Sequence, residues 1–181
     1  GNMTYEVGYV PHNFHFFVTS ASLEGRQADA LKAAEQVRSK APADMMRDPA
    51  MGGMVQHMSL SPLYTRMWFG VWDQVLEEPM PPPDIPFLTA MWHMARGRAY
   101  LATGRLREAE AEHAAVARLR QDPSLKTLYV SSVNTASSIV AIADEVLAGE
   151  IDTKRRRVER AHLSRDRGRG LAQVDAEIAH R

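Results

Sequence analysis

The amino-acid sequence predicts an all-α protein built as a right-handed α-α superhelix of about three to four helical hairpins. Hydrophobic residues recur at three- and four-residue steps through much of the chain, and no segment shows a convincing strand-like alternation. In addition, a glycine followed five residues later by a small or apolar residue recurs along the chain. The 181 residues, 45% of them apolar, are enough to bury a core.

Helical segments follow one another along the chain. An amphipathic pattern predicts a helix over residues 28–41, and a Met-rich pattern predicts a kinked helix within residues 43–63. The prolines at residues 81–83 cannot continue a helix, so they predict a stiff, extended connection into the next one. Further helices are predicted over residues 84–103, 106–120 and 133–147.

The two ends of the chain are expected to differ from the repeats. The Arg-Gly-Arg-Gly sequence at residues 167–170 predicts a helix break, which leaves residues 171–178 as a short terminal helix. We therefore expect a repeat domain over residues 5–165 and an irregular or short helical tail over residues 166–181. The opening Gly-Asn-Met is typical of the remnant of a cleaved tag, so we expect the native protein to be longer.

The recurring glycines predict tight turns between paired helices. A turn of this kind needs a residue that adopts positive φ at little cost, and glycine does so. The residue five positions later is small or apolar, which allows the two antiparallel helices to approach closely. The pairs are Gly25 with Ala30, Gly70 with Val75, and Gly104 with Ala109, and a fourth copy without the glycine is Arg156 with Ala161.

The third copy resembles a tetratricopeptide repeat. The matching residues are Gly97, Tyr100, Gly104, Ala109 and Pro123, whereas His93 and Arg96 stand where the repeat usually carries Trp and Leu. More narrowly, residues 9–16, 24–26 and 91–97 resemble a group of uncharacterised bacterial tetratricopeptide-like proteins, and the resemblance extends over roughly residues 5–165. It implies an α-solenoid and further repeats on both sides of this segment.

Several polar side chains are candidates for ligand contacts, because they lie on or near helices that come first in their pairs. In stacked hairpins these first helices line the concave surface, so the side chains could converge on one groove. Three interpretations remain open: a polar binding groove, a transition-metal site that includes histidines three residues apart, and purely structural histidines. The candidates are His12, Asn13, His15, His57, His93, Arg96 and Tyr100.

The methionines and tryptophans favour packing roles. Six methionines lie between residues 45 and 67, and although thioethers can bind copper(I), methionine more often fills gaps where helices meet. Trp68, Trp72 and Trp92 have no interleaved basic residues, so they fit helix packing better than base stacking.

Composition excludes several classes of function. The formal net charge is zero, so no overall field attracts nucleic acid or an anionic membrane. The basic run at residues 154–157 is typical of a solvated helix face, and nucleic acid is an unlikely partner. The absence of cysteine excludes disulfides, thiolate metal sites and a cysteine nucleophile. No segment suits a membrane span or a signal peptide, so we expect a cytoplasmic protein.

These observations predict a non-enzymatic module that binds a peptide or a partner helix in a concave groove, without a cofactor. Phosphate loops, nucleophile elbows and His-Glu-x-x-His pairs are missing from the sequence. The alternative is a metal-dependent or small-molecule-binding enzyme in which the groove histidines hold an ion. Self-association through an open end of the stack is a further expectation, because a truncated array exposes an apolar end face.

Overall fold

The computed structural model of the protein describes residues 10–131 and 134–179, with side chains described for residues 12–131 and 134–160. These residues form helices and contain no strand, which confirms the all-α prediction. The α-helices are α1 Val10–Leu23, α2 Gln27–Ser39, α3 Gly52–Ser59, α4 Ser61–Trp68, α5 Trp72–Glu77, α6 Pro86–Ala102, α7 Leu106–Leu119 and α8 Ala136–Ala179. Two short 3₁₀ helices, η2 Ala43–Arg47 and η3 Pro123–Lys126, lie between them.

Three helix pairs are closed by turns of the same geometry. Gly25, Gly70 and Gly104 have φ of 74°, 67° and 82°, which confirms the predicted positive-φ turns. In each turn the glycine amide donates to the carbonyl three residues back, and the next amide donates to the carbonyl five residues back. This is the Schellman arrangement, which satisfies carbonyls at the end of the first helix. The five-residue bonds join Arg26 to Ala21, Val71 to Arg66, and Arg105 to Tyr100.

The residue after each glycine also begins the second helix of the pair. Its backbone φ lies between −81° and −94° and its ψ between 64° and 70° in all three turns. Four residues further on, the predicted contact residues Ala30, Val75 and Ala109 are fully buried. The same short sequence pattern therefore produces the pairs α1/α2, α4/α5 and α6/α7.

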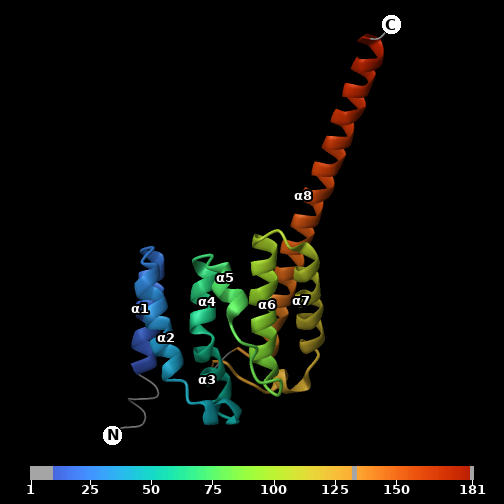
Figure 1. Ribbon diagram of the computed structural model, residues 1–181. Helices are drawn as coiled ribbons and strands as arrows, with labels where there is room; N and C mark the ends of the chain where they lie inside the picture. The colour runs from blue at the N-terminus through green and yellow to red at the C-terminus, as the bar shows by residue number, and fades with distance from the viewer. Residues whose placement is uncertain (1–9, 132–133, 180–181) are drawn as a thin grey trace.

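Successive pairs pack in chain order. The first helix of the next pair, or α8 after the last pair, contacts both members of the pair before it: α4 packs against α1 and α2, α6 against α4 and α5, and α8 against α6 and α7. Figure 1 shows the pairs side by side, with α8 beside α6 and α7 and extending beyond them. A large apolar core surrounds α6 and includes Phe87, Val116 and Leu147, while a smaller cluster of Val18 and Val37 holds α1 against α2.

Three sequence predictions differ from the structure. The Met-rich segment forms η2, α3 and α4 instead of one kinked helix. The predicted break at residues 167–170 and the glycine-free turn at Arg156 are also wrong, because α8 continues from Ala136 to Ala179. Glycine in a helix interior costs only about 1 kcal/mol relative to alanine, and the surrounding Arg, Ala and Glu residues favour the helix.

A ring of four charged side chains joins the first two pairs. Arg38 of α2 and Arg66 of α4 each contact both Glu35 of α2 and Glu78, which follows α5. The Arg66 and Glu78 side chains are only 15% and 13% exposed. The Trp92 indole N–H of α6 donates to the Glu78 carbonyl oxygen at 2.8 Å, so Glu78 also contacts the third pair.

Removal of one charge from this ring should destabilise the fold. Glu78→Gln leaves the largely buried guanidinium of Arg66 with only the more exposed carboxylate of Glu35, so we expect a loss of about 2 kcal/mol in the free energy of unfolding. Glu24→Gln is the matched control, because its ion pair with Arg26 is about half exposed and should contribute less than about 1 kcal/mol. Urea unfolding followed by circular dichroism measures both, and equal effects would contradict this assignment.

Two glycines in helices should respond oppositely to alanine. A Cβ on Gly53 of α3 would lie 2.2 Å from the Tyr129 carbonyl oxygen, so Gly53→Ala should cost about 2 kcal/mol or more. A Cβ on Gly149 of α8 would meet nothing within 4 Å, so Gly149→Ala should stabilise by about 0.5–1 kcal/mol. Chemical denaturation of the two variants checks the signs, and destabilisation by both would show that α8 is packed differently at Gly149.

Candidate functional site

The first helices of the first two pairs form a groove that exposes large apolar side chains. This α1–α4 groove has a volume of about 190 Å³ and is lined by His15, Thr19 and Leu23 of α1 and by Tyr64 and Trp68 of α4, among others. Leu23 is 73% exposed and Trp68 is 64% exposed. The prediction that Trp68 packs between helices is therefore wrong for most of its surface.

Two predicted candidates, His15 and His57, lie next to each other, and His15 lines this groove. Their ring centroids are 6.4 Å apart and nearly perpendicular, and the His57 ring lies 5.6 Å from that of Tyr64. The Nδ1 atom of His57 is buried and has no hydrogen-bond partner among the described residues. Burial, together with the neighbouring His15, lowers the pKa of His57 below its usual value, while burial raises the pKa of Tyr64. Both side chains are therefore neutral near pH 7.

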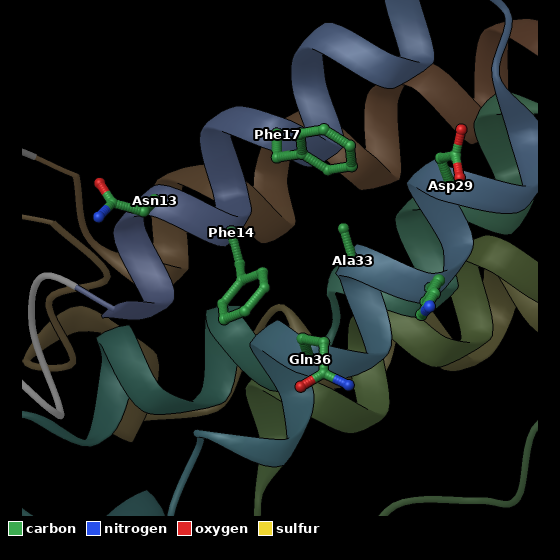
Figure 2. A pocket seen from close by; sticks show the side chains of 7 residues that line it. Asn13, Phe14, Phe17, Asp29, Ala33 and Gln36 are labelled. Atoms are coloured by element: carbon green, nitrogen blue, oxygen red, sulfur yellow. The ribbon is translucent and has the colours of Figure 1, made fainter.

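His12 and Asn13 lie outside the contact between His15 and His57. The exposed His12 ring packs edge-on against Phe16, with 4.6 Å between ring centroids. Asn13 belongs with Phe14 and Phe17 to another stripe of α1, which borders a separate groove of about 560 Å³ between α1 and α2. Figure 2 shows these side chains on α1, with Asp29, Ala33 and Gln36 on α2 across from them.

The remaining candidates, His93, Arg96 and Tyr100, lie together on α6 and contact α5 and α7. The Nδ1 atom of His93 is 2.5 Å from one carboxylate oxygen of Glu112 on α7, and the Arg96 guanidinium donates to the other at 2.9 Å. Arg96 also donates to the Leu76 carbonyl oxygen at 2.8 Å and to the Tyr100 hydroxyl at 2.6 Å. All five N–H donors of a guanidinium are directional, so this set of partners fixes its position.

This network provides partners within the protein for the Nδ1 atom of His93 and for all three guanidinium nitrogens of Arg96. The guanidinium lies 4.5 Å from the Trp92 ring centroid, a cation–π geometry. Although burial opposes the change, hydrogen bonds from His93 and Arg96 lower the pKa of Glu112, so the carboxylate stays charged. The arrangement joins α5, α6 and α7. It therefore favours a structural role for His93 and Arg96.

The positions of the histidines do not favour the hypothesis of a metal site. The structure brings His15 and His57 together, but places His93 in the network with Glu112. Among the described side chains, no group of three or more His, Asp or Glu residues could hold a metal ion. Two imidazoles alone supply fewer protein ligands than the three or four usual for zinc.

Sequence reasoning missed a further groove, between α6 and α8. This α6–α8 groove has a volume of about 600 Å³, and its lining includes Trp72 at the start of α5, Leu101, Val146, Gly149 and Lys154. The basic run at residues 154–157 is visible in the sequence, but no local pattern shows which apolar residues of other helices lie beside it. Only the packing of α8 on α6 brings these two sets of side chains together.

Comparisons with protein-family models, with curated proteins and with solved structures found no match for this chain. In the part of the chain that the structure describes, no helix combines the length and the apolar character that crossing a membrane requires. The case for a function therefore depends on the geometry of the helices and their exposed side chains.

Acid should weaken the junction between α1 and α3 through His57. Because its pKa is lowered in the folded state, the unfolded state binds more protons as the pH falls below about 6.5. We therefore expect the free energy of unfolding to decrease from about pH 7 to about pH 5, and His57→Phe to reduce this decrease. Measurements at about pH 8, where His57 is neutral in both states, provide the reference for packing changes alone. An unchanged pH profile in the variant would contradict this role.

Proposed function

We propose that the protein is a non-enzymatic binding module, a right-handed α-solenoid of the tetratricopeptide type, that binds a peptide or a partner helix. The binding surface consists of the exposed sides of the first helices of the pairs, α1, α4 and α6, together with α8. In such arrays these helices line the concave side, and the small rotation between pairs produces an extended surface for partners.

The observation that carries this proposal is the repetition of one turn geometry with one packing rule. Three glycine turns have the same dihedral angles and hydrogen bonds, and each is followed by a helix that packs across the preceding pair. Repeats of this kind cannot bury their apolar faces singly, so neighbours complete the core and leave one side of each first helix free for contacts.

The exposed apolar residues support a protein or peptide partner. Leu23 and Trp68 lie at one groove, where the Trp68 indole N–H donates to the Ser22 carbonyl oxygen at 3.3 Å. Tryptophan contributes strongly to protein interfaces because it buries a large area with few rotatable bonds. A groove of about 190 Å³ is small for a drug-sized ligand, but it suits one anchoring side chain of a partner.

Affinity capture with one alanine substitution tests this proposal. We expect the wild-type chain to retain a specific partner, and Trp68→Ala to weaken that binding at least about tenfold, which corresponds to about 1.4 kcal/mol. Tyr129→Ala is the matched control, because its side chain is 55% exposed but lies outside the α1–α4 groove. Quantitative titration of the captured partner measures the affinities. Equal binding by the wild type and Trp68→Ala would contradict the proposal.

Light scattering over a range of concentrations addresses self-association. If a second copy of the chain occupies the surface, the apparent mass rises with concentration and Trp68→Ala lowers it. A constant monomer mass together with a captured partner supports the hetero-association that we propose.

A further inference from the structure

The α6–α8 groove combines an apolar floor with exposed cations. On the floor, Leu101 of α6 is buried beside Val146 of α8, which is 45% exposed. One helical turn earlier, Ile142 on the same side of α8 is 65% exposed. Large aliphatic side chains of this exposure, arranged on one stripe of a helix, provide the contact surface that an apolar helix face needs.

Gly149 leaves open space in the middle of this groove. A Cβ at this position would meet no atom within 4 Å, so packing inside the protein does not require glycine here. Glycine in a helix interior lowers helix stability, and a residue without a side chain allows a second helix to approach the backbone closely. The position therefore suits the close approach of a partner.

The charges around the groove are unequally compensated. Of the carboxylates that line it, Glu150 pairs with Arg98 at 3.0 Å and Glu145 pairs with Arg120 at 2.9 Å. Lys154 and Arg157 also line the groove, and neither forms an ion pair among the side chains that the structure describes.

The uncompensated charge continues along α8. Two further arginines of α8, Arg156 in the basic run and Arg160 just after it, are exposed beyond the groove and likewise form no ion pair with a described side chain. An approaching segment therefore meets apolar surface first and positive charge towards the C-terminal side of α8. Acidic groups on that segment complement this charge, whereas basic groups are repelled.

We propose that the α6–α8 groove binds an acidic amphipathic helix of a partner protein. Its apolar face contacts Ile142, Leu101 and Val146, its backbone approaches Gly149, and its carboxylates reach Lys154 and Arg157. This is helix-in-groove recognition, in which apolar anchors provide affinity and charge provides orientation. The inference rests on the proposed function as a binding module, and it specifies the chemistry of the partner and a place separate from the α1–α4 groove.

A model peptide tests the inference directly. The probe is a fluorescent helical peptide of about 18 residues, with Leu on one face and Glu on the other, and fluorescence anisotropy measures its binding to the full chain. We expect saturable binding that weakens as salt rises from about 50 to about 200 mM, because screening reduces the charge contacts. The same peptide with Lys in place of every Glu should bind at least about tenfold more weakly.

Variants of the protein test separately the role of the cations and the role of the open space at Gly149. Lys154→Glu combined with Arg157→Glu should weaken binding of the Glu peptide at least about tenfold. The matched control, Lys40→Glu combined with Lys126→Glu, makes the same change of charge at exposed positions outside the groove and should not alter binding. Gly149→Leu should abolish binding by filling the groove, while its unfolding midpoint stays at or above that of the wild type, since a Cβ at this position meets no atom within 4 Å and leucine favours the helix.

Three results would overturn the inference. Equal binding of the Lys peptide would show that the cations of α8 play no part. Binding of the Glu peptide that survives Gly149→Leu would place it elsewhere. Tighter binding of a single-stranded oligonucleotide, insensitive to Gly149→Leu, would assign the basic residues to nucleic acid instead. If a captured partner is lost with Trp68→Ala while the peptide does not bind, this inference is wrong and the proposed function is supported. If the peptide binds and Gly149→Leu abolishes its binding, the inference is supported even where the Trp68 surface captures no partner.

Discussion

Reversal of the chain within three residues is the constraint on which the rest of the structure depends. At Gly25, Gly70 and Gly104 the backbone enters the left-handed region, and the amides of the turn satisfy carbonyls that the preceding helix would leave unpaired. Because the dihedral angles are the same, the second helix leaves each turn in the same direction. The residue five positions after the glycine then lies at the helix contact, where its small or compact side chain is buried.

Polar contacts join each unit to the next. The ring around Glu78 joins α2, α4 and the end of α5, and the Arg96 guanidinium joins α5, α6 and α7. Arg120, which directly follows α7, donates to Asp144 of α8 at 2.8 Å. Each contact includes partly buried charges whose partners must be correctly placed, so it discriminates against shifted packing. Apolar burial supplies most of the stability, and these contacts specify how successive helices align.

Side chains that are not used in these internal contacts are free to contact partners. His93 and Arg96 are engaged inside the protein, whereas Leu23, Trp68 and Val146 expose apolar area on first helices or on α8. Exposed apolar area on its own is ordinary, but its position at grooves between helices is typical of interaction sites. At the α6–α8 groove, the cations of α8 lie on one side of the apolar floor, so they would orient a partner that binds there.

The sequence by itself determined the helical class and the three turns, since periodicity and the positive φ of glycine are local properties. It also located α2, α6 and α7 to within a few residues, whereas it missed the boundaries of α4 and α5. It could not show that His15 meets His57 while His93 pairs with Glu112, because these contacts join helices distant in the chain. Nor could it show which charges stay uncompensated: Glu150 and Lys154 belong to one helix, but only the packing of α6 brings Arg98 to the glutamate. Tertiary structure decides such pairings because they depend on distances between elements, which no local pattern encodes.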